Sequence, residues 1–483
     1  MEIFNLCTMC RIRSRIGPLT ASGILAFCVT FAAVPAWAQQ KGCATGTFPS
    51  YLDEQPGKKP PGYTGPVFSL SQNYPQTLPP KAAYPWLKVP VPNGRISDPK
   101  AYVMAVKQYV LEGNTDTDFV FQNNKVRPWF HLPWMHASPI GREFIHGLTH
   151  EKDSAPGVLD TTNQKNWSGT WAVSGINDRG AYGVGQVWCD PAKPNPLALN
   201  PNPNEANFMP DGSAQVKLLF ATASITEVPW LKNSLEWRAD MNQLSNPLTM
   251  CAPATNACPG QMTCNLGVCF AARKISSARL LQMDIAVRDD RISGTGWAFG
   301  TFAYNVNAPG VTVWDRMIPI GLQWGLDPGI TAEMVKQRGS GLIRESWINQ
   351  AADPLKPNGI FAGGNHLGYA GRLNGPADDP ASACMSCHLN AGLIPPIAPG
   401  IVPGALPIVP AAAPGPMTTE RMLTWFLNIP AGVAANSELT SSLDYSLQLT
   451  LGIQRFYTSQ ATTDAQRKTL HMVTRGSEVF QKK

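Results

Sequence analysis

The chain has 483 residues and a formal net charge of +6, which is close to neutral for this size and argues against a nucleic-acid partner. Its 44 prolines and 42 glycines predict a loop-rich fold. A chain this long can bury a large core and has room for two or three domains.

The first 38 residues have the organisation of a secretory signal peptide. Arg11, Arg13 and Arg15 precede an apolar run over residues 19–34, and a small-residue cleavage site ends at Ala38. We therefore expect residues 1–38 to be removed and the mature protein to be periplasmic or secreted. A retained membrane helix is the weaker alternative, and no transmembrane anchor is expected after cleavage, because no later segment has 18 uninterrupted apolar residues.

Residues 39–96 are dense in proline and aromatic residues. Proline at this density prevents helix formation, so we expect an extended arm packed on the body rather than a Pro-rich ligand for a partner. Residues 97–151 form the next segment, which begins with an amphipathic helix. Ser97 or Asp98 caps this helix, and Pro99 occupies its first turn.

Histidine is concentrated in the same segment. Four of the seven histidines lie there: His131, His136, His146 and His150. If residues 141–150 are helical, His146 and His150 share one face at metal-ligand spacing. Structural or surface histidines are the simpler interpretation, and a metal site or contact with a cofactor are the alternatives.

Residues 152–345 read as a β body. Short segments rich in Val, Trp, Phe and Tyr follow one another between Gly, Asn, Asp and Pro turns, and residues 177–180 fit a hairpin turn between the first two. The fold class predicted is mainly β, with an antiparallel β-sandwich-like body. To it are added the amphipathic N-terminal helix, a disulfide-rich insertion and a loop-rich C-terminal segment.

The insertion, residues 245–270, contains four cysteines within a Pro- and Gly-rich stretch. They are Cys251, Cys258, Cys264 and Cys269. In an exported chain they predict two disulfides, whose pairing the sequence leaves open, and a zinc knuckle is the alternative. Cys43 and Cys189 are candidates for a third bridge.

Residues 346–483 form the C-terminal segment. A Pro-rich loop over residues 393–416 excludes an all-helical form for this segment. Residues 418–428 fit a short helix capped by a threonine. Residues 443–453 alternate in the manner of a last strand, although a Leu-rich stretch is also compatible with a helix.

The most informative motif in this segment is Cys384-Met385-Ser386-Cys387-His388. A C-x-x-C-H run is the attachment signature of a c-type haem: each thiol adds to one vinyl group, and the histidine binds the iron. A Cys384–Cys387 disulfide and half of a zinc site are the alternatives, but no second C-x-x-C follows to complete a Cys₄ zinc site. We expect one covalent haem c held by Cys384 and Cys387, with His388 as axial ligand.

Four stretches carry a family resemblance: residues 141–151, 280–305, 314–328 and 371–388. The chain resembles uncharacterised exported bacterial proteins with one C-terminal c-type haem motif, a family containing a cytochrome c domain. The resemblance implies that the β body and the haem motif belong to one unit. It implies no substrate or reaction, carries a role over only to Cys384, Cys387 and His388, and does not include the Cys-rich insertion.

These expectations favour a periplasmic single-haem c-type cytochrome that transfers electrons to or from a redox partner protein, with the β domain used for docking or recognition. The alternative is a haem-dependent oxidoreductase, or a haem-based ligand-binding or sensor protein, with an open iron coordination site. Because a carrier is favoured over a catalyst, no catalytic residue is named. The sequence leaves the sixth iron ligand open among Met417, Met422, His366, His146, His150 and none.

Overall fold

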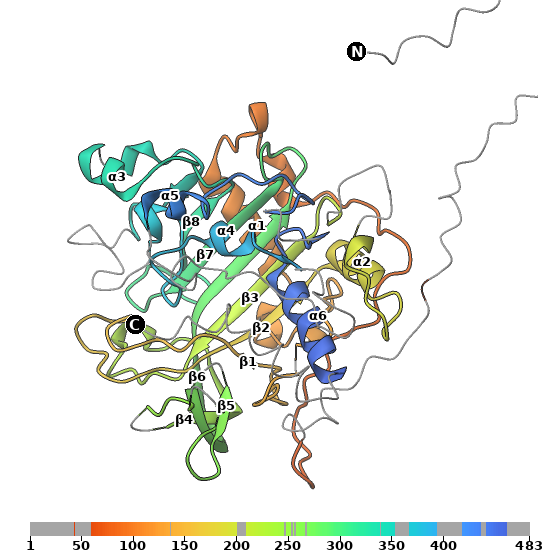
Figure 1. The fold of residues 1–483 in the computed structure, drawn as a ribbon, viewed down its shortest axis with the longest axis vertical. Helices are drawn as coiled ribbons and strands as arrows, with labels where there is room; N and C mark the ends of the chain where they lie inside the picture. Colours follow the sequence, from red (N-terminus) through yellow and green to blue (C-terminus); the bar gives the residue numbers. More distant parts are fainter. Residues whose placement is uncertain are drawn as a thin grey trace, which may run out of the picture. The chain divides into compact units, whose positions relative to one another are not determined.

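The structure is a computed structural model. It describes Cys43 and residues 59–135, 137–199, 209–245, 248–252, 255, 257–265, 268–338, 340–352, 367–393, 418–435 and 441–460. The chain separates into two compact units, Met1–Lys41 and Gly42–Lys483, and every described residue belongs to the second (Figure 1). The proposed signal peptide therefore lies outside the described residues.

One antiparallel sheet organises this unit. Its main path runs in the order β1 (Thr149–His150), β2 (Thr170–Ile176), β3 (Ala214–Ala221), β6 (Val268–Arg288), β7 (Trp297–Tyr304), β8 (Met317–Gln323) and β9 (Ser346–Ile348). Two further strands, β4 (Glu236–Leu244) and β5 (Thr263–Asn265), pair with the far end of the long strand β6 (Figure 1). The expectation of a mainly β, antiparallel body is confirmed, whereas the sandwich arrangement is not, because these nine strands belong to a single sheet.

Helix α1 (Pro99–Leu111) covers one face of this sheet. The Asp98 side chain caps the helix by accepting a hydrogen bond from the Ala101 amide at 2.9 Å, as the sequence predicts. The buried side of α1 faces β7, where a Cβ on Gly300 would stand 2.7 Å from Val103 Cγ2. Glycine at this position therefore allows the helix and the strand to approach closely.

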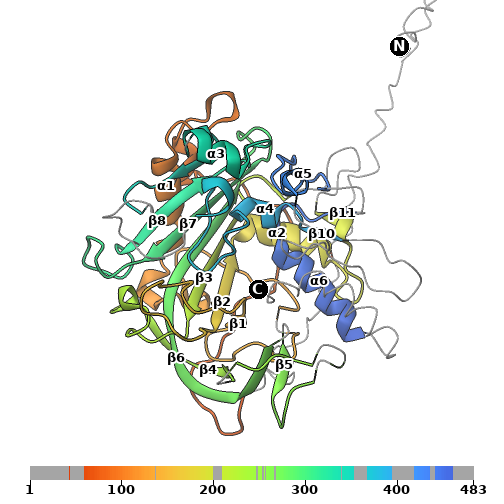
Figure 2. The ribbon, with the colours of Figure 1, turned by 60° about the vertical axis from the view of Figure 1, so that its left-hand side comes forward.

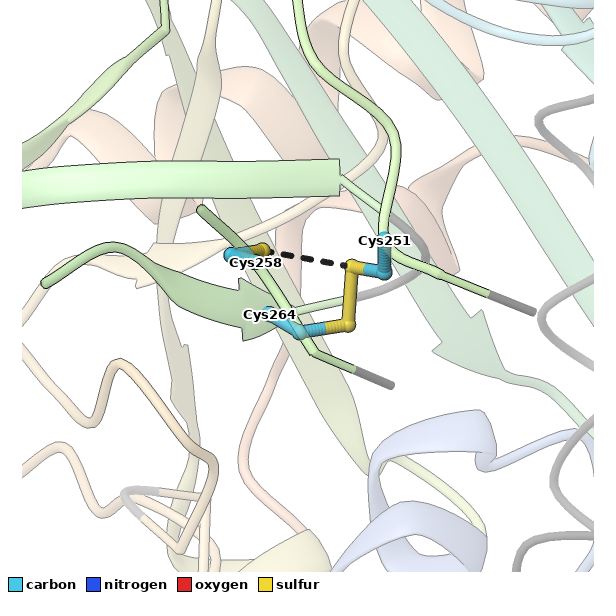
Figure 3. A group of neighbouring side chains, drawn as sticks. All are labelled: Cys251, Cys258 and Cys264. Carbon is cyan, nitrogen blue, oxygen red and sulfur yellow. Dashed lines mark hydrogen bonds between the residues drawn. A yellow bond between two sulfur atoms is a disulfide. The ribbon is translucent and has the colours of Figure 1, made fainter. Parts of the chain in front are cut away.

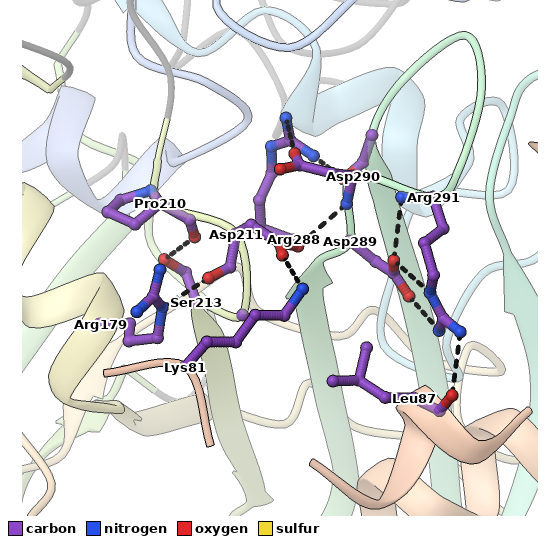
Figure 4. A network of polar contacts seen from close by, with 12 residues as sticks. Lys81, Leu87, Arg179, Pro210, Asp211, Ser213, Arg288, Asp289, Asp290 and Arg291 are labelled. Atoms are coloured by element: carbon purple, nitrogen blue, oxygen red, sulfur yellow. Dashed lines mark hydrogen bonds and ion pairs between the residues drawn. The ribbon is translucent and has the colours of Figure 1, made fainter. Parts of the chain in front are cut away.

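The Pro-rich arm packs against the body, as expected. Tyr84 and Trp86 stack with ring centroids 4.5 Å apart, and the Trp86 ring meets the edge of Tyr109 on α1 at 5.2 Å. Arg291 links the arm to the sheet, because it donates to the Leu87 carbonyl at 3.0 Å and pairs with Asp289 at 2.7 Å (Figure 4). These contacts make the arm a structural layer of the unit.

The three disulfides join the six cysteines expected to be oxidised. Cys43 pairs with Cys189, Cys251 with Cys264, and Cys258 with Cys269. In the insertion the Cys251 and Cys258 sulfurs lie 3.9 Å apart, so the two bridges are neighbours (Figure 3). The Cys251, Cys258 and Cys264 sulfurs lie within 4.8 Å of one another, a spacing that would also suit a metal ion, but all three are bound in disulfides.

One local prediction is wrong, and the helix on which the shared face of His146 and His150 was conditional does not form. Residues 177–180 do not form a hairpin turn: the Asn177 side chain accepts a hydrogen bond from the Gly180 amide at 3.1 Å and caps the helix α2 (Asp178–Val187). Residues 141–150 are not helical either, and Thr149–His150 form the edge strand β1. At Gly147, in that stretch, φ is +78°, and a Cβ would stand 2.5 Å from the Phe68 ring.

The C-terminal segment covers the other face of the sheet. It contributes α4 (Cys384–His388), the pair β10 (Gly392–Leu393) and β11 (Ser441–Ser442), α5 (Thr419–Leu423) and α6 (Leu447–Gln460). α6 therefore takes the helical form of the two left open, and it lies on the same side of the sheet as α4 (Figure 2). Thr418 caps α5 as predicted, but this helix ends earlier than expected.

Shorter helical elements connect these layers. They are α3 (Ala332–Arg338), η2 (Pro85–Lys88), η3 (Pro92–Gly94), η4 (Thr115–Thr117), η5 (Phe121–Asn123), η6 (Pro196–Ala198), η7 (Pro229–Leu231), η8 (Ser340–Leu342) and η9 (Tyr369–Gly371). None of the helices within the described residues is both long and apolar enough to cross a membrane.

Candidate functional site

The C-x-x-C-H run forms the short helix α4, whose first turn is capped locally and bonded to the sheet. At its start, the Ser386 hydroxyl accepts a hydrogen bond from the Ala383 amide at 2.8 Å and donates to the Ala383 carbonyl at 2.9 Å. The Met385 amide donates to Gln323 Oε1 on β8 at 3.0 Å. These bonds satisfy backbone groups that a helix end otherwise leaves open, so α4 has a defined position on the sheet.

The two thiols of α4 are free. Cys384 and Cys387 are not joined in a disulfide, and both are partly accessible. Burial raises the pKa of Cys387 to about 12 and also raises that of Cys384, whose sulfur lies 3.5 Å from Thr301 Oγ1. Both thiols are therefore protonated at neutral pH, unlike the thiolates of a disulfide-exchange enzyme.

The His388 ring is oriented by the backbone. Its Nδ1 lies 2.8 Å from the Tyr445 carbonyl oxygen, and its ring centroid is 4.7 Å from that of Phe299. Burial lowers the pKa of His388 to about 4, so the imidazole is neutral at pH 7. A carbonyl oxygen only accepts hydrogen bonds, so Nδ1 carries the proton and the lone pair remains on Nε2.

The sheet beneath α4 carries a polar row that the sequence analysis did not identify. Ser174, Lys217, Asp284 and Thr301 lie directly opposite one another on β2, β3, β6 and β7. Lys217 Nζ is 3.5 Å from Asp284 Oδ2, and Thr301 Oγ1 donates to Asp284 Oδ1 at 2.9 Å. The available signal was Lys217, the one charged residue of β3, because charged side chains are seldom buried unless they are paired.

Several carboxyl groups surround Lys217 of this row. The Gln282 side-chain amide donates to Asp284 Oδ1 at 2.9 Å and to Asp378 Oδ2 at 3.1 Å, so it separates two carboxyl groups. Burial raises the pKa of Asp284 to about 6, opposed by the charge of Lys217 and reinforced by that of Asp378. Burial alone would lower the pKa of Lys217, but Glu151, Asp284 and Asp378 outweigh it and raise the value.

His146 and His150 are not brought to His388. The His146 ring stacks on Trp237 at 4.3 Å, and His150 pairs with Asp153 at 2.8 Å. Trp237 belongs to the apolar cluster on the α1 face of the sheet, whereas the neighbours of His388 belong to the cluster on the α4 face. The simpler interpretation of His146 and His150, as structural residues, fits these contacts, and the metal-site alternative does not.

Met422 is the remaining candidate iron ligand within the described residues. Met422 is 8% exposed on α5 and belongs to the same apolar cluster as Met385 of α4. His366 and Met417 lie outside the described residues, as do most residues of the Pro-rich loop. Met422 is therefore the one candidate ligand in the described part of the chain that shares a cluster with α4.

A small cavity lies beside His388. Trp297, Met209 and Tyr445 line part of it, and its volume of about 10 Å³ has room for about one water molecule. A group as large as a porphyrin has to lie outside this cavity. On the side of the polar row, Lys217 and Asp284 keep 24% and 23% of their side-chain surface accessible.

Comparisons with protein-family models, with curated proteins and with solved structures find no match to this chain. The functional assignment therefore rests on the chemistry of α4 and the residues around it.

Proposed function

We propose that this chain is an exported c-type cytochrome with a single haem, which transfers electrons to or from a redox partner protein. The observation that carries the proposal is the state of α4, in which two free thiols and a neutral, oriented imidazole lie within five residues. The β body would then serve docking or recognition. We also propose that the chain is a member of the family of exported bacterial proteins with one C-terminal haem motif.

The residues of α4 fit a covalently bound haem c. Cys384 and Cys387 lie three positions apart on one helix face, and neither sulfur is part of a disulfide. The Tyr445 carbonyl holds the Nδ1 proton of His388 and so leaves Nε2 for iron, which is the arrangement that metal-binding histidines require. When bound, the haem supplies one-electron chemistry at iron.

The test of the proposal is covalent attachment. The purified mature protein should retain haem through denaturing electrophoresis and acid-acetone extraction. Cys387→Ala should prevent stable two-bond attachment, whereas His388→Ala should keep the thioethers and lose the low-spin spectrum of the iron. Met385→Leu, a conservative change inside the same helix, is the matched control and should retain both, and complete extraction of haem from the unaltered protein would refute the proposal.

A haem-dependent oxidoreductase is the second candidate, and the polar row favours it. Lys217 and Asp284 carry protonatable groups beneath the α4 helix, and proton delivery is what reduction of a small oxygen- or nitrogen-containing ligand would require. The spectrum of the reduced protein without added ligand separates the two functions. Six-coordinate low-spin haem supports the carrier, and high-spin haem supports the enzyme or a sensor.

A further inference from the structure

The carbonyl that orients His388 belongs to an unusual backbone segment. Asp444 and Tyr445 are consecutive non-glycine residues with φ of +47° and +64°. Side chains other than glycine rarely adopt this left-handed conformation, and two in succession persist only where surrounding contacts hold them. The direction of the Tyr445 carbonyl therefore depends on whatever holds this segment.

The Asp444 side chain supplies two of the hydrogen bonds that hold it. This residue is 0% exposed, and its Oδ2 accepts a hydrogen bond from the Met209 amide at 2.7 Å. Its Oδ1 accepts from the Gly432 amide at 2.9 Å, and its own amide donates to Ser442 Oγ at 3.1 Å. Asp444 thus connects two separate segments, at Met209 and at Gly432, to the corner that precedes α6.

We infer that Asp444 is a positioning residue for His388. By holding residues 444–445 in the left-handed conformation, it directs the Tyr445 carbonyl at Nδ1 and so selects the imidazole tautomer whose Nε2 is free to bind a metal. As a role toward haem iron this inference rests on the proposed function, whereas the effect on the tautomer is a property of the chain itself.

A carboxylate is the side chain that this role requires. Both carboxylate oxygens accept, and each takes a different backbone amide. Asparagine has one accepting oxygen, and its NH₂ group would face the other amide donor. Asp444→Asn should therefore release one of the two bonds and loosen the carbonyl of the next residue without a large change in volume.

Asp327 provides a matched control. It also has a positive φ, of +45°, and its carboxylate also accepts two backbone hydrogen bonds, from Arg344 at 2.8 Å and from Glu345 at 2.9 Å. Within the described contacts, neither Asp327 nor its neighbours bond to His388. Asp327→Asn therefore reproduces the loss of a backbone bond in a left-handed aspartate without touching the Tyr445 carbonyl.

The experiment reads His388 in two ways. In the full mature chain carrying Cys384→Ser and Cys387→Ser, which prevents thioether attachment, ¹⁵N chemical shifts of the imidazole give the tautomer ratio. We expect mainly the Nδ1–H form, and Asp444→Asn should raise the proportion of Nε2–H to Nδ1–H about tenfold. In the haem-loaded protein, Asp444→Asn should weaken the hydrogen bond to Nδ1 and so make the imidazole a less basic iron ligand. The reduction potential should therefore rise by about 59 mV, which corresponds to a tenfold change in the equilibrium constant of a one-electron reduction.

Each outcome decides the inference. Asp327→Asn should change neither the tautomer ratio nor the equilibrium constant of haem reduction by more than about twofold. An equal effect of the two substitutions would overturn a specific role for Asp444. If Asp444→Asn does not fold, Ser442→Ala removes the acceptor of the Asp444 amide and should shift both readings in the same direction by a smaller factor; no shift would overturn the inference. If the purified chain carries no haem, the proposed function fails, and the tautomer ratio alone then decides the role of Asp444.

Discussion

The two faces of the central sheet have opposite chemistry, although adjacent residues of the same strands form them. On the face toward α1, Val173, Leu218, Met283 and Phe302 lie opposite one another, and each is at most 2% exposed. One residue along each strand, the face toward α4 carries Ser174, Lys217, Asp284 and Thr301. The first row is a packed core, and the second is a hydrogen-bonded, partly accessible polar row.

The difference indicates how the fold divides its tasks. The apolar row supplies stability by removing side chains from water, an effect that does not depend on direction. The polar row contributes less to stability, because ionised groups lose hydration when they are buried, but it places directional groups beneath the cysteines of α4. Changes on the α1 face should therefore alter stability without altering the site, and changes on the α4 face should alter the site at a smaller cost in stability.

The largest effect is expected on the apolar row. Phe302 is 0% exposed, so Phe302→Ala should lower the free energy of unfolding by about 3–5 kcal/mol through lost burial and a cavity. Urea denaturation measures this change, and Phe302→Leu, which keeps most of the volume, should cost about 1 kcal/mol. The absorption spectrum of bound haem should be unchanged in both variants, and a changed spectrum would contradict the separation of the two faces.

The second effect concerns pH and the polar row. Because burial raises the pKa of Asp284 to about 6, the folded protein keeps a proton that the unfolded chain releases near pH 4. The stability that this group contributes is therefore fully present below about pH 4 and is lost as pH rises through about 6, by about 2 kcal/mol.

Asp284→Asn tests this dependence, because the amide remains neutral at every pH. From pH 4 to 7 the free energy of unfolding of the variant should rise by about 2 kcal/mol relative to the unaltered protein. Asp116→Asn, at an exposed carboxylate, is the control and should leave the profile of the unaltered protein in place. Parallel profiles for Asp284→Asn and the unaltered protein would show that this carboxyl group does not retain its proton in the folded state.

The smallest effect is expected at Thr301. Thr301→Val removes the donor to Asp284 at nearly constant volume, so it should lower the free energy of unfolding by about 1–2 kcal/mol. Thr301→Ser keeps the hydroxyl and should recover most of that loss. The Thr301 hydroxyl lies 3.5 Å from the Cys384 sulfur. A change in the haem spectrum of Thr301→Val, with no change in that of Phe302→Ala, would therefore sharpen the contrast between the two faces.

Local sequence patterns predicted much of the fold. The cap and apolar spacing of α1, the alternation of the main strands, the packed arm and the oxidised cysteines are all confirmed. Helix α2 was missed because its glycines and apolar residues also alternate with period 2, as in a strand. Asn177 is compatible with a turn or with a helix cap, and only the folded chain shows that it caps α2. The sandwich prediction rested on strand number, which does not determine whether strands join one sheet or two.

The sequence by itself determined which side chains α4 presents, since the spacing of Cys384, Cys387 and His388 places them on one helix face once the segment is helical. Only the tertiary structure decided what surrounds them. His388 and Tyr445 are 57 residues apart, and the polar row joins residues from four strands whose register no local pattern specifies. Such contacts depend on burial and strand pairing across the whole unit, because a slip of one residue would move the charges to the opposite face.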